Sequence, residues 1–134
     1  MKIKKINHLG IAVRDIAEAK KLFKDVLGLQ LTGTEIIEEQ KVKTAFFSIE
    51  GIGLELLEST SPEGPVAAFI EKRGEGFQHL AIEVDNLEGA IAELRANGIQ
   101  MIDRQPRKGA SGTRIAFLHP KSTFGLLIEL IEKR

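Results

Sequence analysis

Two histidines and two glutamates are the residues of this sequence whose types and spacing could do chemistry together. His8 opens an alternating apolar segment, and His79 opens a similar segment 71 residues later. Glu55 and Glu129 each interrupt an aliphatic run, and 74 residues separate them. Because nearly one offset relates both pairs, we interpret them as equivalent positions in two diverged copies of one module.

These four side chains offer imidazole nitrogens and carboxylate oxygens, which bind metals and carry protons. The sequence contains no cysteine, so thiolate ligands, thiolate nucleophiles and disulfides are excluded. A set of two nitrogens and two oxygens suits an ion with open coordination positions, such as Co, Ni, Mn, Fe or Mg, more than structural Zn. The sequence therefore predicts one divalent metal ion, of unknown identity, bound by His8, Glu55, His79 and Glu129.

Strand periodicity predicts where these side chains point. Successive side chains of a strand lie on opposite faces, and the aliphatic residues that alternate with His8 and His79 must pack against helices. Glu55 lies between Leu54 and Leu56, so its carboxylate is expected on the face that bears the histidine, and Glu129 is placed in the same way. Taken singly, such a histidine is usually structural or exposed, and such a glutamate usually faces water. The duplication favours a shared site over that simpler explanation.

The elements that position these residues also occur twice. Residues 6–16 align with residues 77–87 without a gap, and each segment is followed by a helical pattern. The first helix is expected to begin at Asp15 and end at Gly28, and the second to begin at Asp85 or Asn86 and end at Gly98. The expected strands that follow are residues 29–38, 42–49 and 53–58 in the first copy and 100–103, 114–118 and 126–132 in the second.

The expected organisation is one domain over residues 1–134. It comprises module 1 at about 4–60, a linker with a short helix at about 61–76, and module 2 at about 77–133. Each module is predicted to be βαβββ, which makes the fold class α+β.

Bulk composition indicates a soluble globular protein. Apolar residues make up 43% and charged residues 28%, and 19 basic residues balance 19 acidic ones. No global charge attracts nucleic acid or a membrane surface. The basic residues at the start are followed by no apolar stretch of signal-peptide length, so we expect a cytoplasmic protein.

Several strings resemble the vicinal oxygen chelate superfamily and, within it, the methylmalonyl-CoA epimerases, over essentially the whole chain. The strings are residues 8–13, 26–29, 54–57, 60–62, 69–76, 79–81, 115–122 and 127–130. The resemblance implies that the two modules form a half-open, cupped mixed sheet with helices on the outer face. It also implies one divalent ion in the cup, a small-molecule acyl-CoA substrate and a homodimer. The family's ligands match His8, His79 and Glu129, with Glu55 at the fourth position.

The sequence departs from the family at two positions. Gln78 stands where many members have a second histidine next to the retained one. Thr44 stands where one type of epimerase has a second acid/base glutamate, so the second proton carrier is left undecided.

The expected activity is metal-dependent epimerisation of methylmalonyl-CoA. A bound ion would make the C2 proton removable through a chelated enolate, and Glu129 and Glu55 would carry protons on its two faces. Lys121 and Ser122 are expected to orient the substrate, although a plain surface hairpin also explains them. His119 before Pro120 is as consistent with a structural hydrogen bond as with a substrate contact.

Two other functions remain open. Glyoxalase I (lactoylglutathione lyase) uses a similar histidine and glutamate set and also moves a proton next to a carbonyl. A metal-free small-molecule binding or resistance protein would keep the fold and lose the ligands. An extradiol dioxygenase is disfavoured by the length of the chain.

Overall fold

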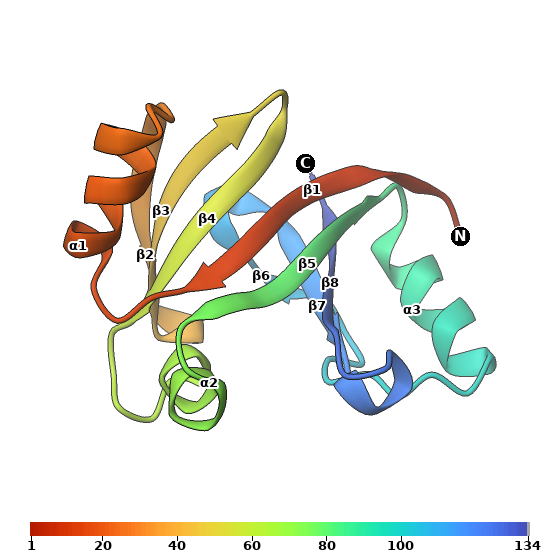
Figure 1. Cartoon of the computed structure of the whole chain (residues 1–134). Coiled ribbons are helices and arrows are strands. Elements are labelled where there is room, and N and C mark those ends of the chain that lie inside the picture. Colours follow the sequence, from red (N-terminus) through yellow and green to blue (C-terminus); the bar gives the residue numbers. More distant parts are fainter. Residues whose placement is uncertain (134) are drawn as a thin grey trace. The chain divides into compact units, whose positions relative to one another are not determined.

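The computed structural model describes residues 1–133 (Figure 1). These residues form eight strands and three α-helices in the order strand, helix and three strands, which occurs twice around a connecting helix. The elements are β1 (Ile3–Ala12), α1 (Ile16–Lys20), β2 (Leu31–Ile37), β3 (Val42–Ile49), β4 (Ile52–Ser59), α2 (Pro65–Arg73), β5 (Gly76–Val84), α3 (Leu87–Ala96), β6 (Arg107–Lys108), β7 (Arg114–Leu118) and β8 (Leu127–Glu132). The α+β class and the two βαβββ repeats are thereby confirmed.

The chain divides into two compact units, which we call the N-terminal unit and the C-terminal unit. The N-terminal unit is His8–Gln78, and the C-terminal unit consists of Met1–Asn7 with the described residues from His79 onward. Strands β1 and β5 therefore each contribute residues to both units.

The sheet of the N-terminal unit has the strand order β2-β3-β4-β1. Strands β1 and β4 are parallel, whereas β2, β3 and β4 are antiparallel neighbours. One face packs on α1, through a cluster that includes Ile16, Phe47 and Leu56 with the flanking Ile11 and Leu54. The aliphatic residues of β1 and β4 therefore lie on the helix side, as their alternation predicts.

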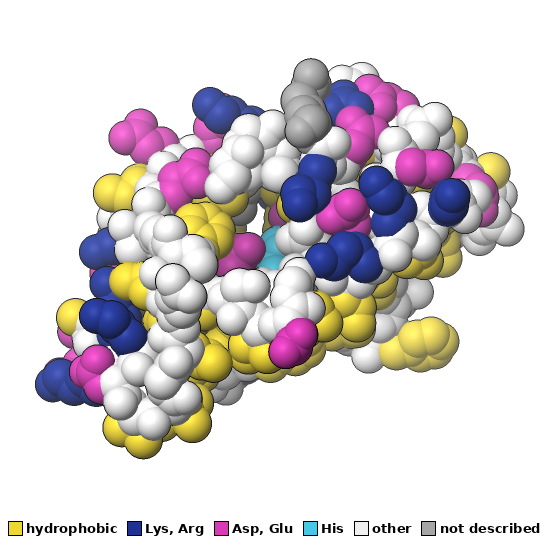
Figure 2. All heavy atoms as spheres, turned by 90° about the horizontal axis from the view of Figure 1, so that it is seen from above, with side chains coloured by type: hydrophobic (Ala, Val, Ile, Leu, Met, Phe, Trp, Pro, Cys, Tyr) yellow, Lys and Arg dark blue, Asp and Glu magenta, His cyan; other side chains and the backbone are white. Residues whose placement is uncertain are grey.

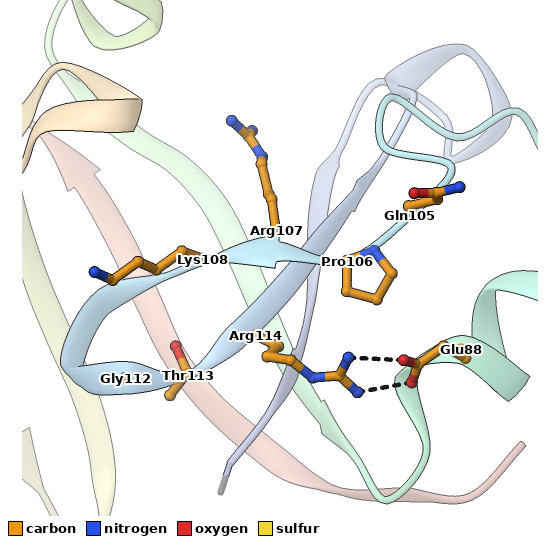
Figure 3. Close-up of a pocket in the computed structure, with 8 residues that line it drawn as sticks. All are labelled: Glu88, Gln105, Pro106, Arg107, Lys108, Gly112, Thr113 and Arg114. Atoms are coloured by element: carbon orange, nitrogen blue, oxygen red, sulfur yellow. Dashed lines mark hydrogen bonds and ion pairs between the residues drawn. The ribbon is translucent and has the colours of Figure 1, made fainter.

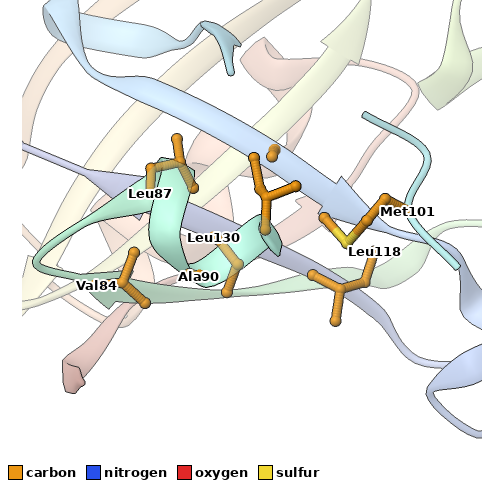
Figure 4. Packing of buried hydrophobic residues seen from close by; sticks show 8 residues of the cluster. Val84, Leu87, Ala90, Met101, Leu118 and Leu130 are labelled. Carbon is orange, nitrogen blue, oxygen red and sulfur yellow. The ribbon is translucent and has the colours of Figure 1, made fainter. Parts of the chain in front are cut away.

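The C-terminal unit repeats this arrangement with the strand order β5-β8-β7-β6. Strands β5 and β8 are parallel, and β8, β7 and β6 are antiparallel neighbours. Val84, Leu118 and Leu130 of one sheet face, together with Met101, pack on Leu87 and Ala90 of α3 (Figure 4). In both sheets we call the opposite face, which the helix does not cover, the site face.

Helices α1 and α3 begin where the sequence predicts, and each of these two helices is capped twice. Asp15 and Asn86 are the N-cap residues, and their side chains accept backbone N–H groups of the first turn. A second carboxylate comes from the last strand of the same module. Glu58 accepts the N–H of Ile16 at 2.8 Å, and Glu132 accepts the N–H of Leu87 at 2.9 Å.

The two expected helix ends differ in form. After Lys20 the first helix continues as a π-helical segment, η1 (Lys21–Val26), before the chain turns at Gly28. The second helix ends before Gly98, and both glycines have positive φ, 75° and 80°, which suits a residue without a Cβ.

The expected strand at residues 100–103 is wrong. Met101 forms only an isolated bridge to Leu118, and the strand that pairs with β7 is β6, which lies farther along the chain. Ile102 and Asp103 both donate to the carbonyl of Phe117, so the ladder is interrupted there. The Asp103 carboxylate then accepts the Phe117 N–H at 2.8 Å and replaces a backbone partner.

The expected short helix between the copies is present as α2, with Pro65 in its first turn and Gly74 after its end. No helix within residues 1–133 is both long and apolar enough to cross a membrane.

Candidate metal and acid–base site

In the N-terminal unit, β1 and β4 bring His8 and Glu55 together on the site face. His8 Nδ1 lies 3.2 Å from Glu55 Oε2. His8 is 5% exposed, and the Glu55 side chain is 13% exposed. The parallel register pairs Glu55 with Gly10, whose lack of a side chain leaves room beside the carboxylate.

In the C-terminal unit, β5 and β8 place His79 and Glu129 in the same way. His79 Nε2 lies 2.9 Å from Glu129 Oε1, and both residues are buried. Glu129 is paired across the parallel strands with Ala81, another small residue. Phe117 lies beside Glu129 in the antiparallel register and presents its ring to His79, with centroids 5.8 Å apart and an interplanar angle of 84°.

The two pairs are structurally equivalent. In each unit a small residue, Gly10 or Ala81, is paired with the glutamate across two parallel strands. The histidine lies two residues before that small residue. Little histidine surface is visible on the face shown in Figure 2, where acidic and basic side chains are interspersed. Each unit thus contains a buried imidazole beside a buried or nearly buried carboxylate, an arrangement that can bind a cation or transfer a proton.

Burial of these polar groups follows from the packing of each sheet. The residues that alternate with Glu55 and Glu129 pack toward α1 and α3. They are Leu54 and Leu56 in one unit and Ile128 and Leu130 in the other. The helix side is therefore filled by aliphatic groups, and the carboxylates are directed to the site face.

Thr44 lies on the site face of β3, because it pairs with Leu57 of β4, two residues from Glu55. It is 1% exposed, and its Oγ1 makes no hydrogen bond with any described residue. A threonine hydroxyl does not exchange protons as a carboxylate does. Gln78 is half-buried and precedes His79 on β5, where alternation directs it to the other face.

Lys121 and Ser122 lie in a short 3₁₀ turn, Pro120–Ser122. His119 caps this turn by accepting the N–H of Lys121 at its Nδ1, 3.1 Å away. The Ser122 hydroxyl accepts the N–H of Gln100 at 2.9 Å, whereas the Lys121 side chain is exposed. The structure therefore gives His119 and Ser122 structural hydrogen bonds, and a substrate contact of Lys121 and Ser122 stays a prediction.

The sequence did not single out Arg107, which begins β6. Arg107 pairs with Ile115, and Ile115 packs with Phe117 and Ala81 on the site face. The guanidinium carbon of Arg107 lies 5.4 Å from the ring centroid of Phe117. Alternation could have predicted this position only if β6 had been placed at residues 107–108.

A cavity of about 590 Å³ borders β6 in the C-terminal unit (Figure 3). Its lining residues are Glu88, Gln105, Pro106, Arg107, Lys108, Gly112, Thr113 and Arg114. Arg114 donates from both Nη atoms to Glu88 at 2.7 Å and also binds Glu132. These two carboxylates raise the pKa of the Arg114 guanidinium. The charge of Arg114 is thus already compensated within the protein.

Comparison with known proteins defines the class. The model of the Glyoxalase/Bleomycin resistance protein/Dioxygenase superfamily matches residues 7–117, and the chain belongs to this superfamily. The superfamily assignment agrees with the α+β fold of two βαβββ repeats and with the fold class expected from the sequence.

Full-length relatives narrow the comparison. The YqjC protein of Bacillus subtilis is 42% identical over 130 residues, which cover 97% of this chain and 93% of that protein. The mitochondrial methylmalonyl-CoA epimerase of Dictyostelium discoideum is 36% identical and covers 98% of this chain and 80% of its own length. A solved methylmalonyl-CoA epimerase in complex with methylmalonyl-CoA and NH4⁺ has a TM-score of 0.93 at 33% identity, with 98% and 96% coverage.

A second enzyme class also matches. The lactoylglutathione lyase of Haemophilus influenzae is 32% identical over 140 residues, covering 96% of this chain and 93% of the lyase. This chain is thus similar to methylmalonyl-CoA epimerases over nearly its whole length. Its sequence identity to the lactoylglutathione lyase is of similar size.

Proposed function

We propose that this protein is a metal-dependent epimerase that interconverts the (R) and (S) forms of methylmalonyl-CoA. The observation that carries the proposal is the repeated pair His8–Glu55 and His79–Glu129, with the same strand register in both units. The epimerase relatives, which match nearly the whole chain, support the choice of substrate.

The proposed ligands of the ion are His8, His79 and Glu129, three buried residues, with Glu55 as the fourth. The residues fit such an ion on chemical grounds, because each imidazole already lies within about 3 Å of a carboxylate and all four donors are nitrogen or oxygen. Buried carboxylates need a partner of opposite charge, and a divalent cation provides one. When bound, the ion would act as a Lewis acid for negative charge that develops on the substrate oxygens.

The proton transfer is assigned to glutamates of the chain. In the proposal the Glu129 carboxylate accepts the C2 proton of one epimer, and Glu55 returns a proton to C2 from the other side. General acid/base catalysis of this kind contributes about 10²- to 10⁴-fold in rate. Burial of Glu129 limits contact of bulk water with its carboxylate. Thr44 cannot replace a glutamate in this role, so the pair Glu55 and Glu129 is the one we propose.

The test is exchange of the C2 proton of methylmalonyl-CoA with solvent deuterium, followed by NMR. The wild-type protein loaded with Co²⁺ should exchange the proton and interconvert the epimers. Glu129→Gln and His79→Ala should abolish both processes, whereas Glu71→Gln, which alters an exposed residue of α2, should not. Undiminished exchange in metal-stripped protein would contradict the proposal.

The second candidate is lactoylglutathione lyase activity, which the Haemophilus influenzae relative supports. The two reactions share proton removal next to a carbonyl and differ in the thiol carrier. Parallel assays with methylmalonyl-CoA and with the hemithioacetal of methylglyoxal and glutathione separate them. A protein that turns over neither substrate and binds no divalent ion would instead be a metal-free binding protein.

Assembly and location belong to the same proposal. The resemblance to the superfamily suggests a homodimer, and we propose a cytoplasmic location. Sedimentation equilibrium of the purified chain tests the first expectation. Fractionation of cells that express it tests the second.

A further inference from the structure

We propose that Arg107 is an anion-binding residue that recognises the free carboxylate of a 2-carboxyacyl thioester. This inference rests on the proposed epimerase function and extends it to substrate selection. Every residue in the argument belongs to the C-terminal unit.

Arg107 lies on the same side of its sheet as the histidine and glutamate pair. Its register partner Ile115 is buried in the cluster with Ala81 and Phe117. Ala81 in turn is the cross-strand neighbour of Glu129. The side chain of Arg107 therefore extends over the site face, whereas Arg114 points to the opposite side of the sheet (Figure 3).

A single aromatic ring separates the guanidinium from the imidazole. Arg107 lies 5.4 Å from the centroid of Phe117, and the Phe117 ring meets His79 edge-on at 5.8 Å. His79 is paired with Glu129 at 2.9 Å. A ligand whose acidic carbon reaches Glu129 can therefore direct an adjacent anionic group along the Phe117 ring toward Arg107.

Arg107 retains hydrogen-bonding capacity for a ligand. Its Nε lies 3.1 Å from Asp103 Oδ1, but the geometry is not that of a hydrogen bond. Among residues 1–133, no acceptor binds the two Nη groups. Asp103, which accepts the Phe117 N–H, lies beside the Nε edge of the guanidinium. Two parallel N–H groups match the two oxygens of a carboxylate.

The contrast with Arg114 supports a binding role for Arg107. Arg114 forms a bidentate pair with Glu88 and a further contact with Glu132, so its donors are occupied. Among the described residues, Asp103 is the carboxylate that lies beside Arg107, and the Arg107 side chain is about one-third exposed. The guanidinium also stacks on an aromatic ring, which orients it without consuming its donors.

Equilibrium binding by calorimetry tests the assignment. Three probes are compared. Malonyl-CoA carries both the free carboxylate and the nucleotide, propionyl-CoA carries only the nucleotide, and malonyl-pantetheine carries only the carboxylate. The variants are Arg107→Gln, Arg107→Lys and the control Arg104→Gln, which removes an exposed arginine of the preceding loop. Thermal unfolding of each variant is measured to check that the fold is retained.

We expect Arg107→Gln to weaken binding of malonyl-CoA and malonyl-pantetheine by roughly ten- to hundred-fold, as for the loss of hydrogen bonds to a charged group. Binding of propionyl-CoA should be unchanged. Arg107→Lys should recover part of the lost affinity, because lysine keeps the positive charge but lacks the two parallel N–H donors of the guanidinium. Arg104→Gln should resemble the wild type.

Other outcomes overturn the assignment. Weaker binding of both CoA esters with unchanged malonyl-pantetheine would mean that Arg107 contacts phosphate. Equal affinities of Arg107→Gln and Arg104→Gln for all three probes would exclude an anion-binding role. In both of these outcomes the proposed epimerase function stands if the wild-type protein binds malonyl-CoA and epimerises methylmalonyl-CoA. A wild-type protein that neither binds malonyl-CoA nor epimerises methylmalonyl-CoA contradicts the proposed function itself.

Discussion

The carboxylate of Glu132 accepts a hydrogen bond from the backbone N–H of Leu87, 2.9 Å away, at the residue that begins α3. The equivalent glutamate of the first repeat, Glu58, makes the same bond to Ile16 at the start of α1. In each module the residue three positions after the proposed ligand glutamate thus fixes the start of the helix that covers the sheet. The repeat therefore couples helix placement to the strand that carries the site.

Glu132→Gln is expected to reduce the free energy of unfolding at pH 7 by about 1.5–3 kcal/mol, the range for hydrogen bonds to charged groups. The backbone bond from Leu87, followed by the contact with Arg114, holds the pKa of Glu132 below its usual value. Because this pKa is lower in the folded state, the stabilisation is present above the pKa of the unfolded chain. It is lost as the pH falls through the folded-state pKa. Urea unfolding of wild type and variant is measured between pH 3 and 7, an interval of about four units around the reference glutamate pKa. The difference in free energy of unfolding between the two proteins should become smaller as the pH falls. A difference that does not change with pH would contradict this origin, and Glu71→Gln serves as the exposed control.

His8→Ala and His79→Ala should each abolish stoichiometric binding of Co²⁺, because removal of either imidazole leaves an incomplete ligand set. The measurement is metal content after dialysis together with titration calorimetry. His119→Ala is the matched control, since that imidazole caps a turn through Lys121. Normal metal content in the His8 variant would restrict the site to the C-terminal unit.

Removal of the ion by a chelator should lower the melting temperature of the wild-type protein. A ligand present at 100 times its dissociation constant stabilises the folded state by about 2.7 kcal/mol. His79→Ala should melt at the same temperature with and without chelator. A chelator effect that persists in His79→Ala would show that the ion binds elsewhere.

Phe117→Leu should weaken metal binding while leaving the fold intact. Phe117 is 9% exposed and its ring holds the imidazole of His79 from one side. The smaller side chain should cost about 1 kcal/mol in stability, near the lower end for core substitutions. Denaturation and metal titration measure the two effects, and Phe124→Leu, at a fully exposed position, is the control. Unchanged metal affinity would mean that Phe117 does not position His79.

Thr44→Val should stabilise the protein by about 1 kcal/mol, because it removes a buried hydroxyl whose desolvation is uncompensated. Epimerase activity should persist, since the proposal assigns the protons to Glu55 and Glu129. Chemical denaturation and the epimerisation rate are measured on the same sample. Loss of activity with retained metal would instead show that the Thr44 hydroxyl contacts the substrate.

The faces on which the four proposed site residues lie were predictable because they depend on strand alternation and on duplication. The isolated leucines and isoleucines around Glu55 and Glu129 have to pack on α1 and α3, which leaves one face for each carboxylate. The same local signals predicted the N-caps and both helix-ending glycines. The contacts of His8 and His79 with their respective glutamates follow from the register of parallel strands. The matched offsets predicted the equivalence of the two pairs, not this register.

The region around β6 could not be predicted in this way. Asp103 takes the place of a backbone partner of Phe117, and that bond joins residues 14 positions apart. A side chain that binds a strand residue at such a separation has no signature in local periodicity. The strand was therefore expected at residues 100–103 instead of at β6, and the position of Arg107 was missed. Ser122 shows the same limit, because its hydroxyl binds the N–H of Gln100, 22 residues away.

The sequence by itself determined the two repeats, the inward face of each strand and the chemical identity of the proposed site, because alternation and capping act between near neighbours. Only the tertiary structure decided where β6 pairs, which arginine faces Phe117 and which polar groups are already occupied. Those features depend on hydrogen bonds and ring contacts between distant residues, whose energies are set by three-dimensional packing rather than by local pattern.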